Sequence, residues 1–222
     1  MGQNVAAYVK PYPEKQRHYP WTDDEISRLA ARLHWLERSK RHSVHALNSI
    51  RMLALLGVRK NQVLSLRWSQ VDDSRGLIIW SEHKSDGVGG VETRDITEPV
   101  KIILDRQRAL RVLGQEKVFP GRGKKLINLN WIWGELVNDC ELRKIIPEYD
   151  SVSPTAARIH DLRHFYGDTI ADTGLSDKWS MTLMGHNSIQ ANRRYTKGSD
   201  HVRREHAELI AGKIKTKLRL VS

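Results

Sequence analysis

Cysteine is scarce in this sequence, and long apolar runs are absent. The one cysteine, Cys140, cannot form a disulfide within the chain, which favours a reducing, cytoplasmic setting. No run of about 18 apolar residues occurs, so the sequence predicts no membrane-spanning helix. The N-terminus lacks the apolar core of a secretory signal, and no internal repeat or low-complexity block is present. We therefore expect a folded cytoplasmic protein without membrane contact.

Basic residues dominate the charge of the chain. Its 222 residues include 37 Lys and Arg against 26 Asp and Glu, a formal net charge of +11. The cations are spread along the chain rather than gathered in one tail, which suits a folded binding surface. Because cations that neutralise phosphates release counterions, nucleic acid is the favoured partner. A basic protein that is merely soluble is the alternative.

Helical periodicity covers most of the chain after a short tail. Residues 1–20 contain three prolines and no apolar period, so we interpret them as a tail or linker. Thr22 and Glu25 have the spacing of a capping box, which predicts the start of the first helix. Gly57 follows the second helix, as glycine commonly does. The later helices are expected at 61–68, 99–113, 129–142, 160–174 and 200–217.

Apolar residues at helical spacing predict which helix faces are buried. Trp131 and Trp133 are interpreted as core residues rather than platforms for stacked bases. The other predicted inward residues include Ile26, Leu29, Leu33 and Leu36 in the first helix, Leu47, Ile50, Leu53 and Leu56 in the second, Ile102, Leu104 and Leu110 after Pro99, and Ala207, Leu209, Ile210 and Ile214 near the C-terminus.

Two segments, 77–84 and 91–97, have the composition of strands. The glycine-rich residues 86–90 between them predict the turn of a β-hairpin, with Lys84 near its tip. This cluster lacks the Gly-Lys-Ser/Thr ending of a phosphate loop and joins two strands. Residues 146–155 contain two prolines and are interpreted as a loop. The expected fold class is α+β, mostly helical with a small antiparallel β-sheet.

Side chains that suit phosphate chemistry gather in residues 160–195. Each of them alone is better explained as packing or as part of the surface. Cleavage of a phosphodiester by in-line attack needs a nucleophile, cations for the nonbridging oxygens and a proton for the leaving alkoxide. Tyr, Arg, His and Lys supply all three without a metal. The candidate residues are Arg59, Lys84, His160, Arg163, His186 and Tyr195.

A zinc site is the competing interpretation of the pair formed by His160 and His164. Their spacing, with an acid beside the first histidine, matches the helix of zinc metalloproteases. That helix uses Glu as its base, whereas Asp161 is shorter, and Arg163 would repel a dication. No third ligand is suggested nearby, so we expect no metal and no cofactor.

The motifs, in this order, resemble those of the tyrosine recombinases, or phage-type integrases. The resemblance covers residues 22–197. It consists of a first arginine motif around Arg59, a hairpin lysine at Lys84, an H-x-x-R box at 160–163, an L-x-G-H box at 183–186, and Tyr195 nine residues after His186.

This resemblance implies a site-specific recombinase that cleaves and rejoins DNA strands. Tyr195 would attack a DNA phosphate, form a 3′-phosphotyrosyl link and release a 5′-hydroxyl, so that no ATP is needed. Arg59 and Arg163 would clamp the nonbridging oxygens of the phosphate.

The resemblance implies supporting roles for three further residues. Lys84 would protonate the leaving 5′ oxygen, and His186 would donate a hydrogen bond to a nonbridging oxygen. His160 would help remove the proton from the nucleophile.

Two features depart from the family pattern. Gln62 stands where the family commonly has an acidic residue that supports the first arginine, although its amide oxygen can still accept a hydrogen bond. Only about twenty residues precede the catalytic region, whereas such enzymes usually carry a DNA-clamping domain of about 80–100 residues there. Either the chain is shortened, or it resembles the small recombinases of the fimbrial-switch type.

The expected domains are a tail at 1–20, a catalytic domain at 21–197 and a helical C-terminal segment at 198–222. The family implies double-stranded DNA as partner, a homo-tetramer on paired DNA sites, accessory DNA-bending factors, and a bacterial or archaeal host in which the protein lies near the nucleoid. The C-terminal segment would dock on a neighbouring protomer or pack on its own domain. The basic loop residues Arg122, Lys124 and Lys125 would contact backbone phosphate, or be a solvated loop.

Two other functions compete with recombination. A type IB topoisomerase uses similar chemistry to relax supercoils, but the L-x-G-H box and the spacing to Tyr195 favour a recombinase. A DNA-binding regulator that has lost catalysis is disfavoured because all six catalytic side chains are present.

Overall fold

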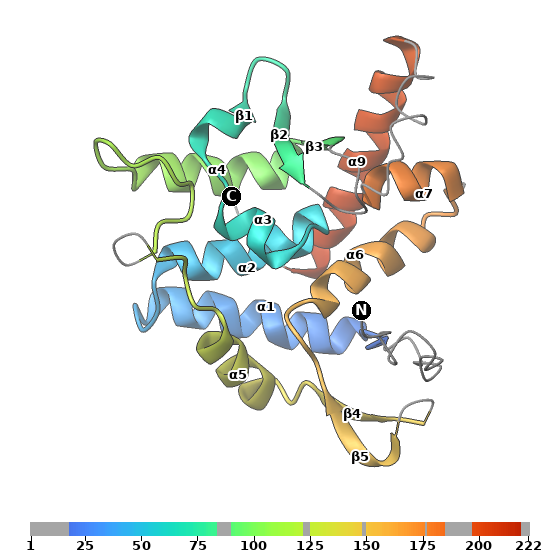
Figure 1. Ribbon diagram of the computed structural model, residues 1–222. Coiled ribbons are helices and arrows are strands. Elements are labelled where there is room, and N and C mark those ends of the chain that lie inside the picture. The colour runs from blue at the N-terminus through green and yellow to red at the C-terminus, as the bar shows by residue number, and fades with distance from the viewer. Residues whose placement is uncertain are drawn as a thin grey trace, which may run out of the picture.

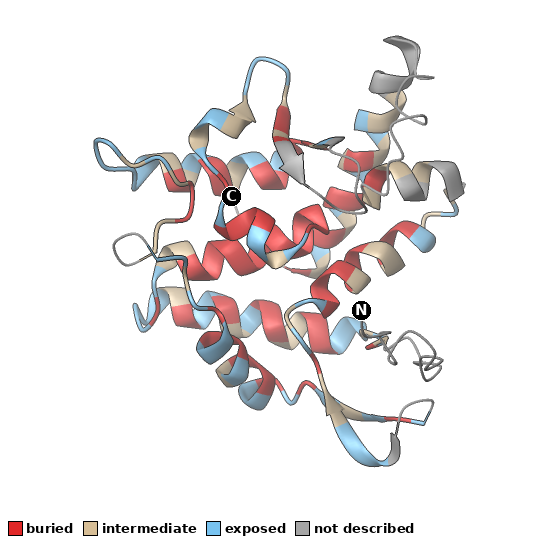
Figure 2. Ribbon diagram, in the orientation of Figure 1, coloured by how far each residue is buried: buried red, intermediate tan, exposed pale blue. Residues whose placement is uncertain are grey.

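Two long helices, α1 (Asp23–Arg38) and α2 (Val44–Leu56), form the centre of the molecule (Figure 1). The computed structural model describes residues 18–83, 90–121, 125–147, 150–175, 177–184 and 197–218. Nearly every residue of α2 is buried, whereas α1 buries one face (Figure 2). The predicted capping box is confirmed, because the Thr22 hydroxyl and the Glu25 carboxylate each accept a backbone hydrogen bond from the other residue.

Other helices cover this central pair. α4 and α6 pack against α2, and α9 packs against α1, α2, α4, α6 and α7, so the last described helix belongs to the same core. In the part of the chain that the structure describes, no helix is both long and apolar enough to cross a membrane. The bounds are α3 Lys60–Leu64, α4 Glu98–Ala109, α5 Asn130–Asp139, α6 Asp161–Ala171, α7 Asp177–Met184 and α9 Lys197–Lys217.

A three-stranded antiparallel sheet confirms the predicted hairpin. It consists of β1 (Val71–Asp72), β2 (Leu77–His83) and β3 (Gly90–Asp95), in that order. The pairing of Trp80 with Glu92 fixes the register of the hairpin. Residues 86–89 of the predicted turn lie outside the described residues, and Gly90 is the first residue of β3, where it pairs with His83. The short strand β1 was not predicted, because two residues are too few to show a period.

The loop predicted at 146–155 is wrong. β4 (Arg143–Ile146) and β5 (Asp150–Ala156) pair there as a second antiparallel hairpin. Pro154 is tolerated in β5 because a two-stranded sheet consists of edge strands, where a missing N–H need not break a ladder.

Several predicted helices end earlier than expected: α3 ends at Leu64, α4 at Ala109, α5 at Asp139 and α6 at Ala171. α4 ends at Ala109, so Leu110, predicted to face inward, is 45% exposed. In α5, Trp133 is buried and donates a hydrogen bond to the Ala157 carbonyl (2.9 Å), whereas Trp131 is 65% exposed. Leu209 of α9 is exposed as well, whereas the remaining inward predictions are buried except for Ile102, which is partly buried.

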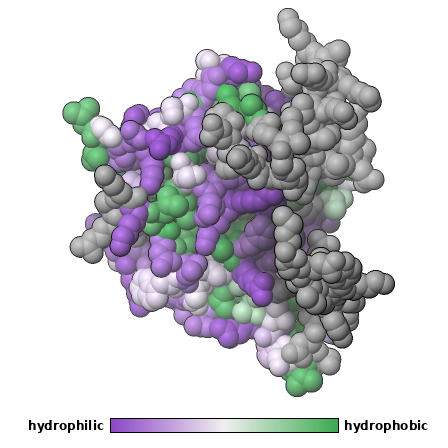
Figure 3. Space-filling view, viewed as in Figure 1, coloured by the Kyte–Doolittle hydropathy of each residue, from purple (hydrophilic) through white to green (hydrophobic). Residues whose placement is uncertain are grey.

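The described surface is largely hydrophilic on the face shown in Figure 3, where apolar side chains form small separate patches. The residues just before α1 pack on the domain: Tyr19 is fully buried and donates a hydrogen bond to Glu25 (2.7 Å).

Candidate active site

Arg59 lies at the turn between α2 and α3. Gly57 ends α2 in the left-handed conformation (φ 59°), and Arg59 is the N-cap residue of α3. Its side chain is exposed, and its guanidinium group makes no hydrogen bond or ion pair within the described part of the chain. Its backbone N–H, in contrast, donates to the Gln62 side-chain oxygen (2.8 Å). The turn therefore fixes the backbone and leaves the cation available.

Arg163 extends from α6 toward the same turn. It is 9% exposed, and its two terminal nitrogens donate to the carbonyl of Gly57 and to that of Met184 (2.9 Å for the latter). The side chain thus joins the end of α2 to the end of α7. Tyr166 of the same helix packs on Gly57, so α6 contacts this turn through two neighbouring residues.

Arg94 of β3 is a third arginine near these two, and the sequence analysis missed it. It is 5% exposed, and its Nε donates to the Leu56 carbonyl (3.2 Å) at the end of α2. Its Nη2 donates to Glu92 on the same strand (2.7 Å). A charged pair at i, i+2 in a strand lies on one face, and that spacing could have indicated a shared environment. Arg59, Arg94 and Arg163 are called the arginine cluster below.

The arginine cluster concentrates positive charge. Burial, followed by the charges of Arg94 and Arg59, lowers the pKa of Arg163 to about 10. Glu92 is the carboxylate that opposes this shift. Arg163 stays protonated at neutral pH, so the cluster attracts an anion such as a phosphate.

His160 immediately precedes α6 and joins this electrostatic environment. Partial burial of its ring, and then the charges of His164, Arg163 and Arg59, lower the pKa of His160, and Asp161 opposes them. The imidazole is therefore neutral at pH 7, the form that accepts a proton. In the sequence His160 stands within three residues of Arg163, the spacing that the H-x-x-R box requires.

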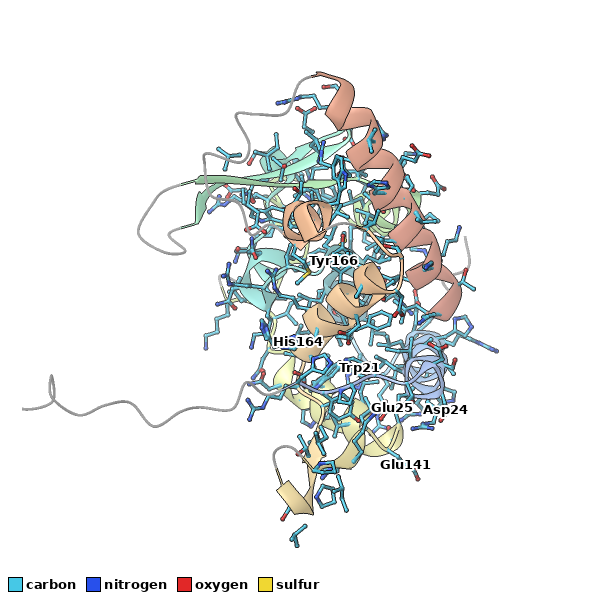
Figure 4. The ribbon with its side chains drawn as sticks, turned by 90° about the vertical axis from the view of Figure 1, so that its right-hand side faces the viewer. Trp21, Asp24, Glu25, Glu141, His164 and Tyr166 are labelled. Atoms are coloured by element: carbon cyan, nitrogen blue, oxygen red, sulfur yellow. The ribbon has the colours of Figure 1, made fainter. Side chains whose placement is uncertain are left out.

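The start of α6 is held by the chain that precedes α1. Trp21 donates a hydrogen bond to the Asp161 carbonyl (2.8 Å), and Figure 4 shows Trp21 and His164 beside this part of the helix. The His164 ring lies edge-on to those of His160 (5.6 Å) and His18 (5.4 Å). Across the described ranges, no group of three or more His, Cys, Asp or Glu residues is arranged to hold a metal ion.

Three of the six predicted catalytic residues lie in the described chain, and Arg59 and Arg163 are near enough to His160 for their charges to lower its pKa. Lys125 is also described and is exposed. The other predicted residues, Lys84, Arg122, Lys124, His186 and Tyr195, lie outside the described residues.

The chain matches the model of one protein family and several solved structures. The model of the phage integrase family matches residues 21–201. The crystal structure of XerA recombinase is 16% identical with a TM-score of 0.54, and the match covers 95% of this chain and 68% of that one. The comparison with curated proteins finds no match.

Two structures solved with DNA have the same fold. For the Tn1549 transposon integrase in complex with a circular intermediate DNA, identity is 18%, TM-score 0.58, and coverage 90% of this chain and 69% of that one. The structure of a lambda integrase tetramer bound to a Holliday junction is 15% identical with a TM-score of 0.54, and the match covers 87% of this chain and 52% of that one. At such identities the likeness concerns the fold.

Proposed function

This chain belongs to the phage integrase family, and we propose that Tyr195 is the nucleophile with which it cleaves and rejoins DNA. Family membership identifies the activity as site-specific recombination, and the roles of single residues are our proposal. The supporting observation is that Arg59, which is exposed and whose guanidinium has no partner among the described residues, lies near enough to the buried, anchored Arg163 for its charge to lower the pKa of Arg163.

The arginine cluster supplies the charge that phosphoryl transfer requires. In the pentavalent transition state, negative charge grows on the nonbridging oxygens, and guanidinium groups bind such oxygens in a forked geometry. Arg163 is fixed by two carbonyls, and the backbone of Arg59 is fixed by Gln62. Donors held in place before the reaction need little reorganisation when the charge develops.

Proton transfers complete the step. A bond forms between the Tyr195 oxygen and phosphorus while the bond from phosphorus to the 5′ oxygen breaks. His160, neutral at pH 7, accepts the tyrosine proton, and Lys84 donates a proton to the leaving oxygen. His186 donates to a nonbridging oxygen. Rejoining reverses these transfers, since the phosphotyrosyl link retains the energy of the cleaved ester.

Double-stranded DNA is the proposed partner, and a homo-tetramer on two sites is the proposed assembly, in which accessory DNA-bending factors take part. The net charge of +11 supports binding to DNA. The Tn1549 integrase was solved with DNA and lambda integrase as a tetramer on a Holliday junction, which supports the same partner here.

Residues 21–197 form the proposed catalytic domain, with 198–222 as its C-terminal segment. The basic loop at Arg122, Lys124 and Lys125 would contact the DNA backbone, and the cytoplasm of a bacterial or archaeal host is the proposed location.

Covalent capture tests the nucleophile. A pool of duplexes with a randomised core and one nick per molecule would trap the cleaved strand, because the short cleaved product diffuses away. The wild type should give an adduct that resists SDS, and Tyr195→Phe should give none while still binding DNA. Tyr149→Phe, which changes a tyrosine outside the family motifs, should behave as the wild type. An adduct with Tyr195→Phe would overturn the assignment.

The competing functions give different results in the same experiments. A topoisomerase would relax supercoiled plasmid but would not exchange strands between two duplexes that carry the cleaved sequence. A regulator that has lost catalysis would bind the duplex pool and form no adduct.

A further inference from the structure

A carboxylate on β3 reaches the position where the first arginine motif lacks its acid. Gln62 occupies that position, and its side-chain oxygen accepts a hydrogen bond from the Arg59 backbone (2.8 Å). The Gln62 side-chain nitrogen donates to Glu92 Oε2 (2.7 Å). The second oxygen of Glu92 accepts from Arg94 Nη2 (2.7 Å). A continuous hydrogen-bond chain therefore joins Arg59 to Arg94 through Gln62 and Glu92.

This chain of hydrogen bonds is buried and held from both sides. The Gln62 residue is 2% exposed, the Arg94 residue 5%, and the Glu92 side chain 11%. Glu92 pairs with Trp80 of β2, whose indole N–H donates to the Gln62 carbonyl (3.3 Å). The hairpin that carries Glu92 is thus in direct contact with the turn that carries Arg59.

Glu92 determines the orientation of the Gln62 amide. A carboxylate only accepts hydrogen bonds, so the amide nitrogen must face Glu92 and the amide oxygen must face the Arg59 N–H. The opposite orientation would place two acceptors together and two donors together in a buried site, where groups without a hydrogen-bond partner destabilise the arrangement. Glu92 also supplies negative charge beside the arginine cluster.

We propose that Glu92 is a positioning residue for catalysis: acting through Gln62, it fixes the turn that presents Arg59, and it replaces the acid that this motif lacks. The proposal rests on the recombinase chemistry proposed above. Glu92 acts through another residue and is assigned no contact with DNA.

Exchanging the two side chains tests this role. In Glu92→Gln, one amide oxygen replaces two carboxylate oxygens, so only one of the two donors keeps its acceptor. If the oxygen accepts from Arg94, two amide nitrogens meet, or Gln62 turns and its nitrogen faces the Arg59 N–H. If the oxygen accepts from Gln62, the new NH2 group faces the Arg94 guanidinium, where two donors meet beside a positive charge. In the double variant Gln62→Glu, Glu92→Gln, every hydrogen bond can form again: Glu at 62 accepts from Arg59 and from Gln at 92, whose oxygen accepts from Arg94. The carboxylate then occupies the position where the family has its acid.

The rate of adduct formation on the nicked duplex pool is the first measurement. Glu92→Gln should lower this rate by about 10–100-fold, as loss of a supporting residue commonly does, with little change in DNA affinity. The double variant should recover to within a few-fold of the wild type. Glu116→Gln is the matched control, because Glu116 pairs with Arg67, whose N–H is bonded to Gln70 in the same way, but its carboxylate is exposed. This control should leave the rate unchanged.

Hydrogen exchange of the Arg59 amide is the second measurement and needs no DNA. The amide should be protected in the wild type and the double variant and should exchange at least about tenfold faster in Glu92→Gln, because an amide without its acceptor is open to exchange. Urea denaturation confirms that each variant is folded. If Glu92→Gln forms the adduct at the wild-type rate, or if the double variant is folded but still forms it slowly, the role given to Glu92 is wrong, whereas the proposed function is unaffected. A wild type that forms no adduct would overturn the proposed function, and the catalytic role of Glu92 with it.

Discussion

Gly57 and Tyr166 are in direct contact at the point where α2 ends. A β-carbon added to Gly57 would come within 2.9 Å of Cε1 of Tyr166 and closer still to Cδ1 and Cγ. The carbonyl of the same glycine accepts a hydrogen bond from Arg163. The close approach of the tyrosine ring and the geometry of the arginine therefore depend on one residue without a side chain.

Gly57→Ala should destabilise the protein and reduce cleavage. A left-handed conformation costs a residue with a β-carbon about 1–2 kcal/mol, and displacement of the buried Tyr166 ring adds to this. Urea denaturation measures the loss. The control is Gly134→Ala, at an exposed position of α5 where an added β-carbon would have open space around it. There alanine should raise the free energy of unfolding by about 0.5–1 kcal/mol. Equal stability of the two variants would contradict the role given to Gly57.

The two arginines proposed to be catalytic should respond differently to alanine substitution. Arg59→Ala should change the free energy of unfolding by less than about 0.5 kcal/mol, because its exposed guanidinium has no partner among the described residues. Arg163→Ala should cost about 1–3 kcal/mol, because it leaves the Gly57 and Met184 carbonyls without their donor. Both should slow adduct formation by about 100–1,000-fold. Lys60→Ala is the control for cleavage, and strong destabilisation by Arg59→Ala would show that the contacts of Arg59 are misassigned.

The pH dependence of His160 follows from its lowered pKa. Nuclear magnetic resonance should give a value below the ordinary 6.5, and Arg59→Gln should raise it, whereas Lys60→Gln should not. Because the unfolded chain binds this proton more tightly, the contribution of His160 to stability is complete above about pH 6.5. It is lost as the pH falls from there toward the folded-state pKa. A value above 6.5 would contradict both the shift and the role of His160 as a proton acceptor at neutral pH.

Local patterns made part of this structure predictable. The capping box at Thr22 and the helix end at Gly57 depend on neighbouring residues, so the sequence shows them directly. Arg59 could be placed at a turn for the same reason. Glu92 and Arg94 could not be assigned, because strand alternation does not say which face of a hairpin packs on a distant helix end.

Errors arose where tertiary packing outweighed a local signal. Pro154 indicated a loop, yet an edge strand accommodates it. Leu110 continues the apolar spacing of α4, but the helix ends one residue before it, and the side chain is exposed. The family resemblance showed that Gln62 stands where an acidic residue is common. Only the fold shows that a carboxylate on another element, that of Glu92, accepts a hydrogen bond from it.

The C-terminal helix α9 provides a matched pair of neighbouring residues. Ile210 is fully buried against the core of its own chain, whereas Leu209 is 49% exposed. Ile210→Ala should lower the free energy of unfolding by about 2–5 kcal/mol, since it removes buried methyl groups and leaves a cavity. Leu209→Ala should change it by less than about 1 kcal/mol, because its side chain is half exposed. Both are measured by urea denaturation at several protein concentrations. If α9 packs on its own domain, the loss in Ile210→Ala is independent of concentration, whereas a loss that appears only at concentrations where protomers associate would mean that the helix docks on a neighbour.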